Sequence, residues 1–509
     1  MKKGIYNIIF GFLGQIITIA LGIIIPRLFI TNLGSAANGL LSSVGQVLSY
    51  LTVLEAGLGG ASIQALYKPV GVNDQGKISE ILSATNWYYK KTGKIYFLCV
   101  IGISLIYPFF INEFTYMVTF IVIFLAGIPG ALNYYYQGKF RVLLQAEGKS
   151  YIISNITTCI TIITSVSKIV LINMGCNLIH LQIAYCAIAL IQIFIYQFYF
   201  WKKYGWINLG ANPDFDAISE KGSVLIHQIA NLILTNTDVI ILTVFTNLKV
   251  VSVYTIYNMV FDMINLSVQT VGNSISYVFG HSYFTDRSKF KKLFEVYEVY
   301  FFAITFALYT VTYLLILPFL KLYTNGVTDI NYIDIYLPML FTLMKLLACS
   351  RTPCLNMINV VGMFKETRKS AVVEAVINLT VSIIAVNRFG IYGVVVGTIV
   401  ALMFRAVDVV CFTNKRILER KSSKTFVRWF LNIMICVVVI WGEKRFVSID
   451  IMNYFVFFKY AFIYGIVIGV IFITFNSIIH FKEFRIVKDT IRSKLCRQKR
   501  WKENDKRAI

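Results

Sequence analysis

Charged side chains are scarce in this chain. Asp, Glu, Lys and Arg make up 14% of its 509 residues, whereas hydrophobic residues make up 57%. A soluble domain usually carries about 25% charged residues. A soluble chain of this length could not hide so much apolar surface, so the composition places most of it in a lipid bilayer.

Signatures of ATP-driven, metal and redox chemistry are missing as well. Residues 147–150 resemble the end of a phosphate-binding loop, but Leu143 stands where the first glycine belongs. The nine cysteines are scattered without metal-binding or redox spacing, so they are expected to act as small apolar residues. The outward loops hold about a dozen residues at most, which leaves no room for an extracytoplasmic catalytic domain. We therefore predict that the protein is not an enzyme and holds no cofactor or metal.

Long apolar runs are abundant instead. Fourteen segments of about 20 residues have the length of membrane-spanning helices rather than the alternating pattern of barrel strands. They begin near residues 6, 39, 94, 115, 151, 177, 223, 250, 297, 332, 371, 391, 426 and 454. Residues 74–91 are amphipathic, and we expect them to form a helix on the inner membrane surface. The predicted fold class is an all-α multi-pass membrane protein with about 14 transmembrane helices.

The basic residues indicate how these helices are oriented. Of the 48 Lys and Arg residues, 37 fall on the side shared by both termini, six on the opposite side and five within spans. Because cytoplasmic loops are enriched in Lys and Arg, both termini are predicted to be cytoplasmic. The first apolar run ends at Pro26-Arg27 without a cleavage site, so we interpret it as an uncleaved span. The net charge of +23 therefore mostly records orientation.

A long polar stretch at residues 201–222 divides the spans into two sets of six. We predict two pseudo-symmetric six-helix lobes around a central cavity, an arrangement common in secondary transporters, with two extra helices. The predicted boundaries are residues 1–200 for the N-lobe, 201–222 for a cytoplasmic linker, 223–414 for the C-lobe, 426–480 for helices 13 and 14, and 481–509 for a basic tail. The tail is expected to lie at anionic membrane lipids, and nucleic acid is not an expected partner.

Polar residues recur at intervals of three and four within several spans, which places them on one helix face. These polar faces comprise Asn7, Gln15 and Thr18; Ser42, Gln46, Ser49, Thr52 and Glu55; Ser154, Thr158, Thr161, Ser165 and Lys168; His227, Asn231, Thr235 and Asp238; and Asn258, Asp262, Asn265, Gln269 and Asn273. Such faces avoid lipid, so we expect them to line a shared polar cavity. The alternative is that they form interhelical hydrogen bonds that only stabilise packing.

Charged and amide side chains in or beside the spans are the candidate site residues. The predicted substrate cavity comprises Arg27, Gln46, Glu55, Lys168, Asn231, Asn265, Lys345 and Arg351. Several cations in one cavity suit an anionic ligand such as a phosphate. Asp238 and Asp262 are candidates for coupling transport to H⁺ or Na⁺. Alternatively, each aspartate pairs with a basic neighbour and fixes helix packing, and Arg351 reaches lipid headgroups at the inner end of its span.

The N-terminal part of the sequence resembles a known family. Residues 25–70 contain Pro26-Arg27 with Leu33-Gly34, then Gly39-Leu40-Leu41, and then Glu55-Ala56-Gly57-Leu58-Gly59 followed by Tyr67-Lys68-Pro69. These features resemble the opening of bacterial polysaccharide and O-antigen flippases of the Wzx type, in the MOP (MATE-like) transporter superfamily. The stretch ILSATNWYYKKTGKIY and the sequence Gly390-Ile391-Tyr392-Gly393 are similar to the same group.

The resemblance implies two six-helix lobes enclosing a cationic cavity. It implies that undecaprenyl-diphosphate-linked oligosaccharide is moved between the leaflets of the bacterial cytoplasmic membrane by alternating access. The partners would be the lipid-linked oligosaccharide, membrane lipids and other polysaccharide-assembly proteins. Arg27 matches the family's first-span arginine, and Glu55 matches its second-span acidic position.

Three alternatives stay open from the sequence. Within the same superfamily, the chain could be a lipid II flippase or a cation-coupled drug antiporter, although the latter more often has twelve spans. A membrane enzyme or assembly factor of polysaccharide synthesis is the alternative outside transport. The short outward loops and the lack of a paired catalytic constellation argue against an enzyme.

Overall fold

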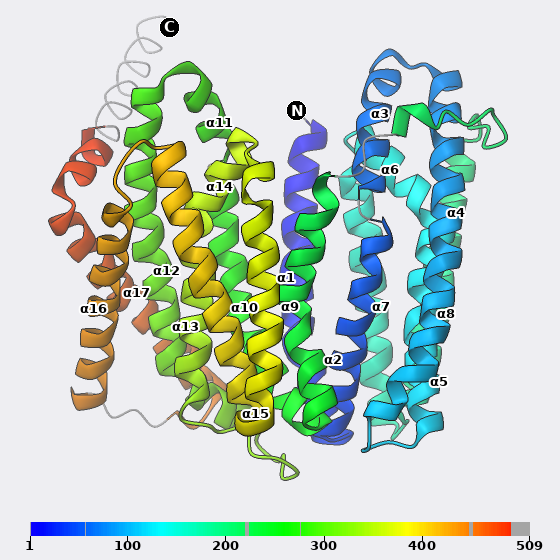
Figure 1. Cartoon of the computed structure of the whole chain (residues 1–509). Helices are drawn as coiled ribbons and strands as arrows, with labels where there is room; N and C mark the ends of the chain where they lie inside the picture. Colours follow the sequence, from blue (N-terminus) through cyan, green and yellow to red (C-terminus); the bar gives the residue numbers. More distant parts are fainter. Residues whose placement is uncertain (1, 56, 219–222, 275, 447–450, 490–509) are drawn as a thin grey trace, which may run out of the picture. The chain divides into compact units, whose positions relative to one another are not determined.

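The structure of the chain is a computed structural model that describes residues 2–55, 57–218, 223–274, 276–446 and 451–489 (Figure 1). Helices are the regular elements of these ranges. The long helices are α1 (Lys2–Asn32), α4 (Gln75–Ile106), α5 (Tyr116–Leu132), α7 (Ser150–Asn173), α8 (Leu178–Lys203), α9 (Ser223–Phe245), α10 (Leu248–Ser274), α12 (Arg287–Tyr323), α15 (Phe364–Arg416), α16 (Ser423–Phe446) and α17 (Tyr454–Ile479). The shorter ones are α2 (Ser35–Tyr50), α3 (Leu58–Val72), α6 (Gly138–Ala146), α11 (Ser276–Thr285), α13 (Leu337–Ser350) and α14 (Thr352–Val361).

The predicted all-α membrane fold is confirmed. Each of the fourteen predicted spans overlaps a helix, and two of them lie in α15, which is kinked at Gly390 with φ 52°. Within the described ranges, nine helices are long and apolar enough to cross a membrane, and Leu232–Phe245 of α9 is a shorter apolar helical stretch. The chain is therefore a multi-pass membrane protein.

The expected surface helix at residues 74–91 is the first half of α4, which runs without interruption to Ile106. Asp74 begins the helix by accepting a hydrogen bond from the Lys77 backbone nitrogen at 2.9 Å. Most of the apolar face predicted for the membrane surface is buried within the protein, because Ile78, Ile81 and Leu82 pack with residues of α3 and α6, whereas Trp87 is 49% exposed. A protein core and a membrane surface require the same amphipathic pattern, so the sequence could not separate them.

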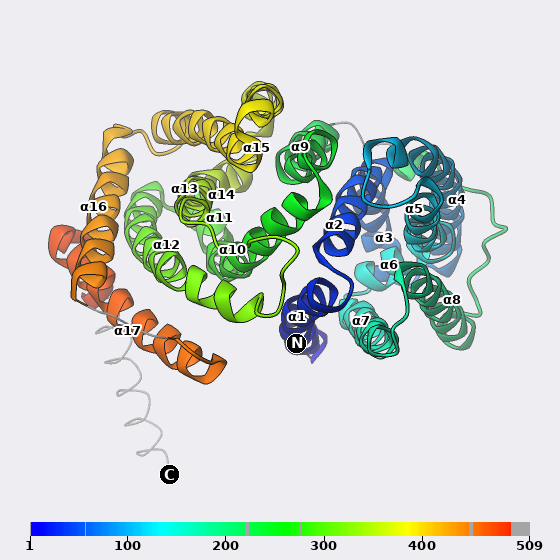
Figure 2. The ribbon, with the colours of Figure 1, turned by 90° about the horizontal axis from the view of Figure 1, so that it is seen from below.

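The chain consists of two compact units. The first comprises Met1–Met259, Gly326–Tyr332 and Ala371–Thr398. In this unit α1 packs on α7, α5 lies between α4 and α8, and α2 packs on α9 (Figure 2). Close packing depends on small residues: a side chain at Gly138 would clash with the ring of Tyr89, and one at Gly127 with Val100. This unit holds most of the predicted polar faces.

The described part of the linker, up to Ile218, lies against the beginning of α4. Ser83 donates a hydrogen bond to the Leu209 carbonyl at 3.0 Å, and Lys77 forms an ion pair with Asp214 at 2.9 Å. The hydrogen bond from Lys77, together with the Ala217 backbone N–H, holds the pKa of Asp214 below its usual value. The predicted linker is thus attached to the first unit by specific contacts.

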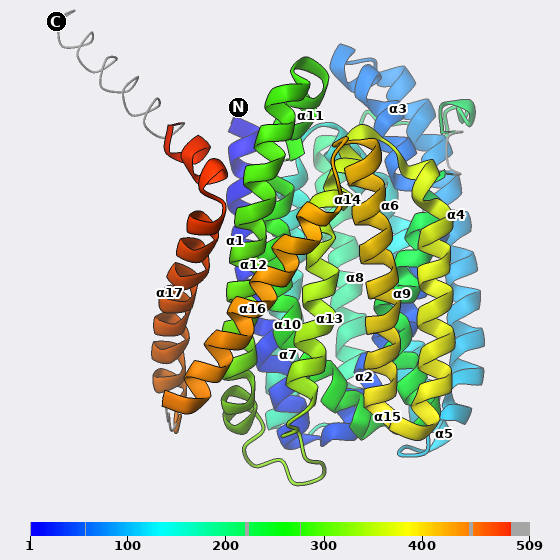
Figure 3. The same cartoon turned by 60° about the vertical axis from the view of Figure 1, so that its left-hand side comes forward.

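The second unit comprises Val260–Asn325, Ile333–Ser370 and Ile399–Ile509 and is organised around α12. This helix contacts α11, α13, α14, α16 and α17, and Figure 3 shows α16 and α17 beside it. The side chains of Phe302, Phe306 and Tyr309 are at most 2% exposed, so aromatic residues fill the centre of the unit. Helices α16 and α17 contain the two additional predicted spans. The last part of the predicted basic tail, residues 490–509, lies outside the described residues.

Candidate functional site

Asp238 is the most deeply buried of the predicted ion-coupling residues. It lies on α9 in the first unit and is 3% exposed. Its carboxylate accepts a hydrogen bond from the Tyr254 hydroxyl at 2.8 Å, and Thr398 Oγ1 lies 2.9 and 2.8 Å from its two oxygens. Three helices, α9, α10 and α15, thus meet at this carboxylate.

Further oxygen atoms surround the contact between Asp238 and Thr398. Thr398 Oγ1 lies 3.2 Å from the Val394 carbonyl and accepts a hydrogen bond from the Asn378 amide nitrogen at 2.8 Å. The amide oxygen of Asn378 is buried and has no hydrogen-bond partner among the described residues. Carboxylate, hydroxyl, amide and carbonyl oxygens are the donor set that binds hard cations such as Na⁺, and the carboxylate can alternatively take a proton.

Glu55 ends a 3₁₀ turn (Leu51–Glu55) that interrupts the second predicted span. Its carboxylate accepts a hydrogen bond from the Tyr89 hydroxyl at 2.6 Å. Two residues after Glu55, Gly57 has φ 82°, a left-handed backbone conformation that favours glycine. A side chain at Gly59 would touch both partners, with Tyr89 Oη at 3.3 Å and Glu55 Oε1 at 3.4 Å. The glycines of the recognised N-terminal motif therefore allow the Glu55–Tyr89 contact.

The other predicted residues of the first unit have separate surroundings. Arg27 and Gln46 are half-buried on α1 and α2. The Lys168 ammonium lies 5.8 Å from the centre of the Tyr185 ring, between α7 and α8. The side chain of Asn231 lies outside the described residues. The structure does not bring Glu55, Lys168 and Asp238 together through any described direct contact.

In the second unit the structure brings three predicted residues together. The Lys345 ammonium on α13 forms an ion pair with Asp262 on α10 at 2.6 Å. Asn265, one turn further along α10, accepts a hydrogen bond from the Cys349 thiol at 3.4 Å. The Lys345 side chain is 13% exposed, whereas the Asp262 side chain is 47% exposed. Lys345 thus joins α13 to α10 and leaves part of the carboxylate accessible.

Two further basic residues of this unit, Arg351 and Arg405, lie on or beside its helices. Arg351 is half-buried between α13 and α14. Arg405, which is 4% exposed, forms an ion pair at 2.9 Å with Asp408, one turn along the same helix. The described ion pair of Arg405 is therefore local to α15.

A buried charge cluster around Glu298 was not identified from the sequence. Glu298 on α12 is completely buried and is bound by Arg428 and by Arg420, the latter at 2.6 Å. Thr425 donates a further hydrogen bond to it at 2.7 Å. Arg428 also forms an ion pair with Glu483 at 2.6 Å. In the sequence, the two arginines belong to the 37 basic residues on the side of the termini, and Glu298 lies at the beginning of a predicted span, where a charge needs no special explanation.

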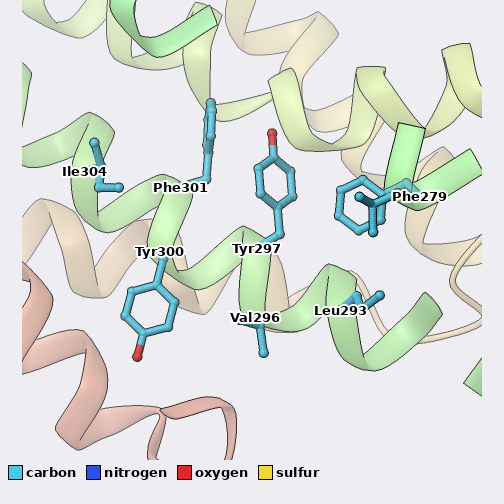
Figure 4. A pocket seen from close by; sticks show the side chains of 8 residues that line it. Phe279, Leu293, Val296, Tyr297, Tyr300, Phe301 and Ile304 are labelled. Atoms are coloured by element: carbon cyan, nitrogen blue, oxygen red, sulfur yellow. The ribbon is translucent and has the colours of Figure 1, made fainter. Parts of the chain in front are cut away.

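An apolar cavity of about 310 Å³ lies on the second unit between α11 and α12. Its walls are hydrocarbon and aromatic side chains. Figure 4 shows Phe279 of α11 beside Leu293, Val296, Tyr297, Tyr300, Phe301 and Ile304 of α12. Tyr300 also contacts Ser477 of α17 at 3.1 Å, so the cavity adjoins one of the two additional spans. Its lining suits an alkyl or isoprenoid chain rather than a polar ligand.

No protein-family model matches the sequence, and no curated protein matches it. Solved structures, in contrast, do match the structure of this chain. An inward-facing multidrug resistance MATE family transporter of the MOP superfamily aligns with a TM-score of 0.64 at 15% identity, covering 79% of this chain and 94% of that one. The lipid II flippase MurJ in an inward closed conformation aligns with a TM-score of 0.62 at 14% identity, covering 93% of this chain and 99% of that one.

A third structure belongs to the same group. A MOP superfamily transporter from Pyrococcus furiosus aligns with a TM-score of 0.58 at 13% identity, covering 82% of this chain and 97% of that one. At these identities the similarity establishes the fold. The chain has the fold of MOP-superfamily transporters and flippases, and its solved neighbours are named as transporters rather than enzymes.

Proposed function

We propose that the protein is a flippase for lipid-linked oligosaccharide repeat units. The cargo would be undecaprenyl-diphosphate-linked and would cross the bacterial cytoplasmic membrane by alternating access, for capsule, O-antigen or exopolysaccharide synthesis. The observation that carries this proposal is the match to a flippase of a lipid-linked precursor over 93% of the chain, compared with 79% for the MATE transporter. A lipid-linked cargo would explain why this chain matches the flippase over more of its length than it matches the MATE transporter.

The polar residues of α10 and α13 support transport of a polar headgroup. Asp262 lies fourteen residues after the first residue of α10, which is about 21 Å along the helix. A half-exposed carboxylate at this depth of a membrane about 30 Å thick needs water rather than lipid beside it. In that aqueous space Lys345 can exchange Asp262 for a diphosphate oxygen, since ammonium groups bind phosphate as point charges. Hydroxyl and amide groups such as Asn265 would bind the sugars.

The apolar cavity supports a lipid-linked substrate rather than a water-soluble one. Its lining, from Phe279 to Ile304, is apolar and lies on membrane helices. We assign it to the polyprenyl chain, which stays in a hydrocarbon environment while the headgroup crosses. A soluble ion would need no such cavity.

Asp238 supports coupling of this transport to a monovalent cation. The carboxylate, the Thr398 hydroxyl and the Val394 carbonyl lie together in a buried position, beside Asn378, whose amide oxygen has no hydrogen-bond partner among the described residues. Binding of Na⁺ or H⁺ would neutralise the carboxylate and change how α9 and α15 are held together. The ion gradient can then drive a conformational change without ATP.

A deletion strain tests the proposed cargo. Loss of the protein should abolish surface polysaccharide and cause lipid-linked repeat units to accumulate in the inner leaflet, measured by mass spectrometry of extracted lipids. Expression of the wild-type chain should reverse both effects. Arg27→Ala should reduce export at normal membrane levels of the protein, because Arg27 is the first-span cation expected to bind the diphosphate. Lys459→Ala is the matched control, since Lys459 is exposed near one end of α17.

The same strain separates the alternatives. Normal surface polysaccharide without an accumulated lipid-linked unit would refute the proposal. Accumulation of lipid II with cell lysis would identify a lipid II flippase, and drug hypersensitivity alone would identify a MATE-type antiporter. If repeat units fail to form at all, the protein is an enzyme or assembly factor.

A further inference from the structure

The connection between α12 and α13 reaches across to the beginning of α2. Asp329 Oδ2 accepts a hydrogen bond from the Ser35 backbone nitrogen at 2.9 Å, and its Oδ1 accepts one from the Ser35 hydroxyl at 2.7 Å. Ser35 is the first residue of α2, so Asp329 supplies the N-terminal cap from 294 residues away. A carboxylate at this position satisfies a free N–H group and complements the helix dipole.

The connection between α4 and α5 supplies the N-terminal cap of α10 in the same way. Glu113 Oε1 accepts a hydrogen bond from the Leu248 backbone nitrogen at 2.6 Å, and Leu248 is the first residue of α10. In the order of predicted spans, α2 and α10 are the second and the eighth. Glu113 follows the third span and Asp329 follows the ninth. The two caps therefore occupy equivalent positions in the two predicted six-span halves, and each carboxylate caps the helix of the opposite half.

Buried hydroxyl groups join the same helices next to the caps. Ser43 of α2 contacts the Tyr107 hydroxyl and the Thr243 hydroxyl of α9, the latter at 2.6 Å. Tyr332 donates to Ser35 Oγ at 2.7 Å and contacts Ser252 Oγ of α10 at 2.8 Å. Asn38 of α2 also donates to Ser252 at 2.8 Å. All of these side chains except those of Asn38 and Tyr107 are at most 3% exposed, and those two are at most 7% exposed.

The backbones of α2 and α10 approach each other at Gly39. A Cβ atom at this position would lie 1.9 Å from the Leu248 carbonyl oxygen. No side chain fits there without separating the two helices. Gly39, which belongs to the recognised N-terminal motif, therefore allows α2 to touch the capped beginning of α10.

We propose that Glu113 and Asp329 are reciprocal latches of an outer gate. This inference rests on the proposed alternating-access function and on the predicted orientation, which places these helix ends on the outer face. The two carboxylates hold α2 against α10 while the protein is closed to the outside. Outward opening requires both caps to break. The beginnings of α2 and α10 must then separate from each other and from the connections that carry Asp329 and Glu113.

Distance measurements between spin labels test the latches directly. Labels at Asn112→Cys and Thr328→Cys, next to the two caps and exposed, would be attached to protein in lipid nanodiscs in a background with its reactive cysteines replaced. We expect one short distance for the otherwise native chain. Glu113→Ala and Asp329→Ala should each raise the population of a longer distance about fivefold, the size expected for loss of one helix cap. The double variant should raise it further, and Gly39→Ala should do so without touching either carboxylate.

Asp334→Ala is the matched control. Asp334 lies in the same connection as Asp329 but caps the helix that follows it, accepting hydrogen bonds from Tyr336 and Leu337 nitrogens at 2.8 and 2.9 Å. An unchanged distance distribution in both latch variants, or an equal shift in Asp334→Ala, would overturn the proposal. The distance measurement needs no substrate, so it is independent of the proposed cargo. If the latch variants change the distances as expected but the protein does not carry oligosaccharide, the proposed function is wrong and the gate proposal still holds.

Discussion

Asp238 and Asp262 were expected to share one role, but the structure gives them different surroundings. Asp238 is buried among hydroxyl and amide groups, whereas Asp262 is half-exposed and bound to Lys345. A carboxylate in contact with hydroxyl groups can share a bound cation with their oxygens, whereas one ion-paired with lysine is better suited to hold or release that lysine. The sequence predicted both as polar-face residues. It could not distinguish them, because the partners Thr398 and Lys345 lie 160 and 83 residues away.

Thr398→Val and Asp238→Asn test the ion site at the residue scale. The wild-type chain should be stabilised by NaCl relative to choline chloride, because binding to the folded state alone adds about 2.7 kcal/mol at a hundredfold excess over the Kd. Both variants should lose this stabilisation, measured by thermal unfolding in detergent. If protons are the coupling ion, acidification should replace the effect of Na⁺ in the wild type only.

Thr413→Val provides the control for the ion site. Thr413 is also completely buried on α15, but its hydroxyl donates to the Cys354 carbonyl at 3.3 Å. This variant should keep the response to the coupling ion. A wild-type chain that responds to neither Na⁺ nor protons would count against the ion site, as would a full response in Asp238→Asn.

At the scale of elements, hydropathy predicted where the helices lie but not all of their partners. The segment at 74–91 was assigned to the membrane surface, whereas α4 buries its apolar face against α3 and α6. The Glu298 cluster was missed for a related reason. Its arginines lie in and beside the connection before α16, and only the packing of α12 against α16 shows that they are buried with a carboxylate.

Glu298→Gln should destabilise the packing of α12 against α16. The change leaves Arg428, itself 4% exposed in its side chain, beside a neutral amide, and breaking a buried charge network commonly costs about 3–5 kcal/mol. We expect a lower unfolding temperature and loss of membrane-inserted protein. Glu419→Gln is the control, because Glu419 is 61% exposed and pairs with Lys291 at the surface, where such a pair contributes about 0–1 kcal/mol. Equal stability of the two variants would show that the cluster does not hold α12 and α16 together.

At the scale of the whole molecule, the fourteen spans follow from the sequence because lipid tolerates only helices or closed barrels. The apolar composition of each run was therefore enough to predict that it forms a helix. The chemistry was harder to predict, since Asp238 with Thr398, and Asp329 with Ser35, meet only after the helices pack. Their sequence separation leaves no periodic pattern to detect. The sequence did supply Asp238, on a polar face, and Gly39, which lies against the beginning of α10 and belongs to the N-terminal motif.

The predicted orientation determines which end of the molecule the gate closes, so it needs an independent test. Alkaline phosphatase is active only outside the cytoplasm, whereas fluorescent protein fusions fluoresce when they lie in the cytoplasm. Phosphatase fused after Thr328 should be active, and the same enzyme fused after Asp214 should be inactive. The reason is the charge asymmetry, in which 37 basic residues lie on one side and six on the other. Fluorescent protein fusions at the same two positions should give the opposite pattern. If phosphatase is active after Asp214 instead, the Glu113 and Asp329 caps lie at the cytoplasmic end, and the same latches would control entry of the cargo rather than its release.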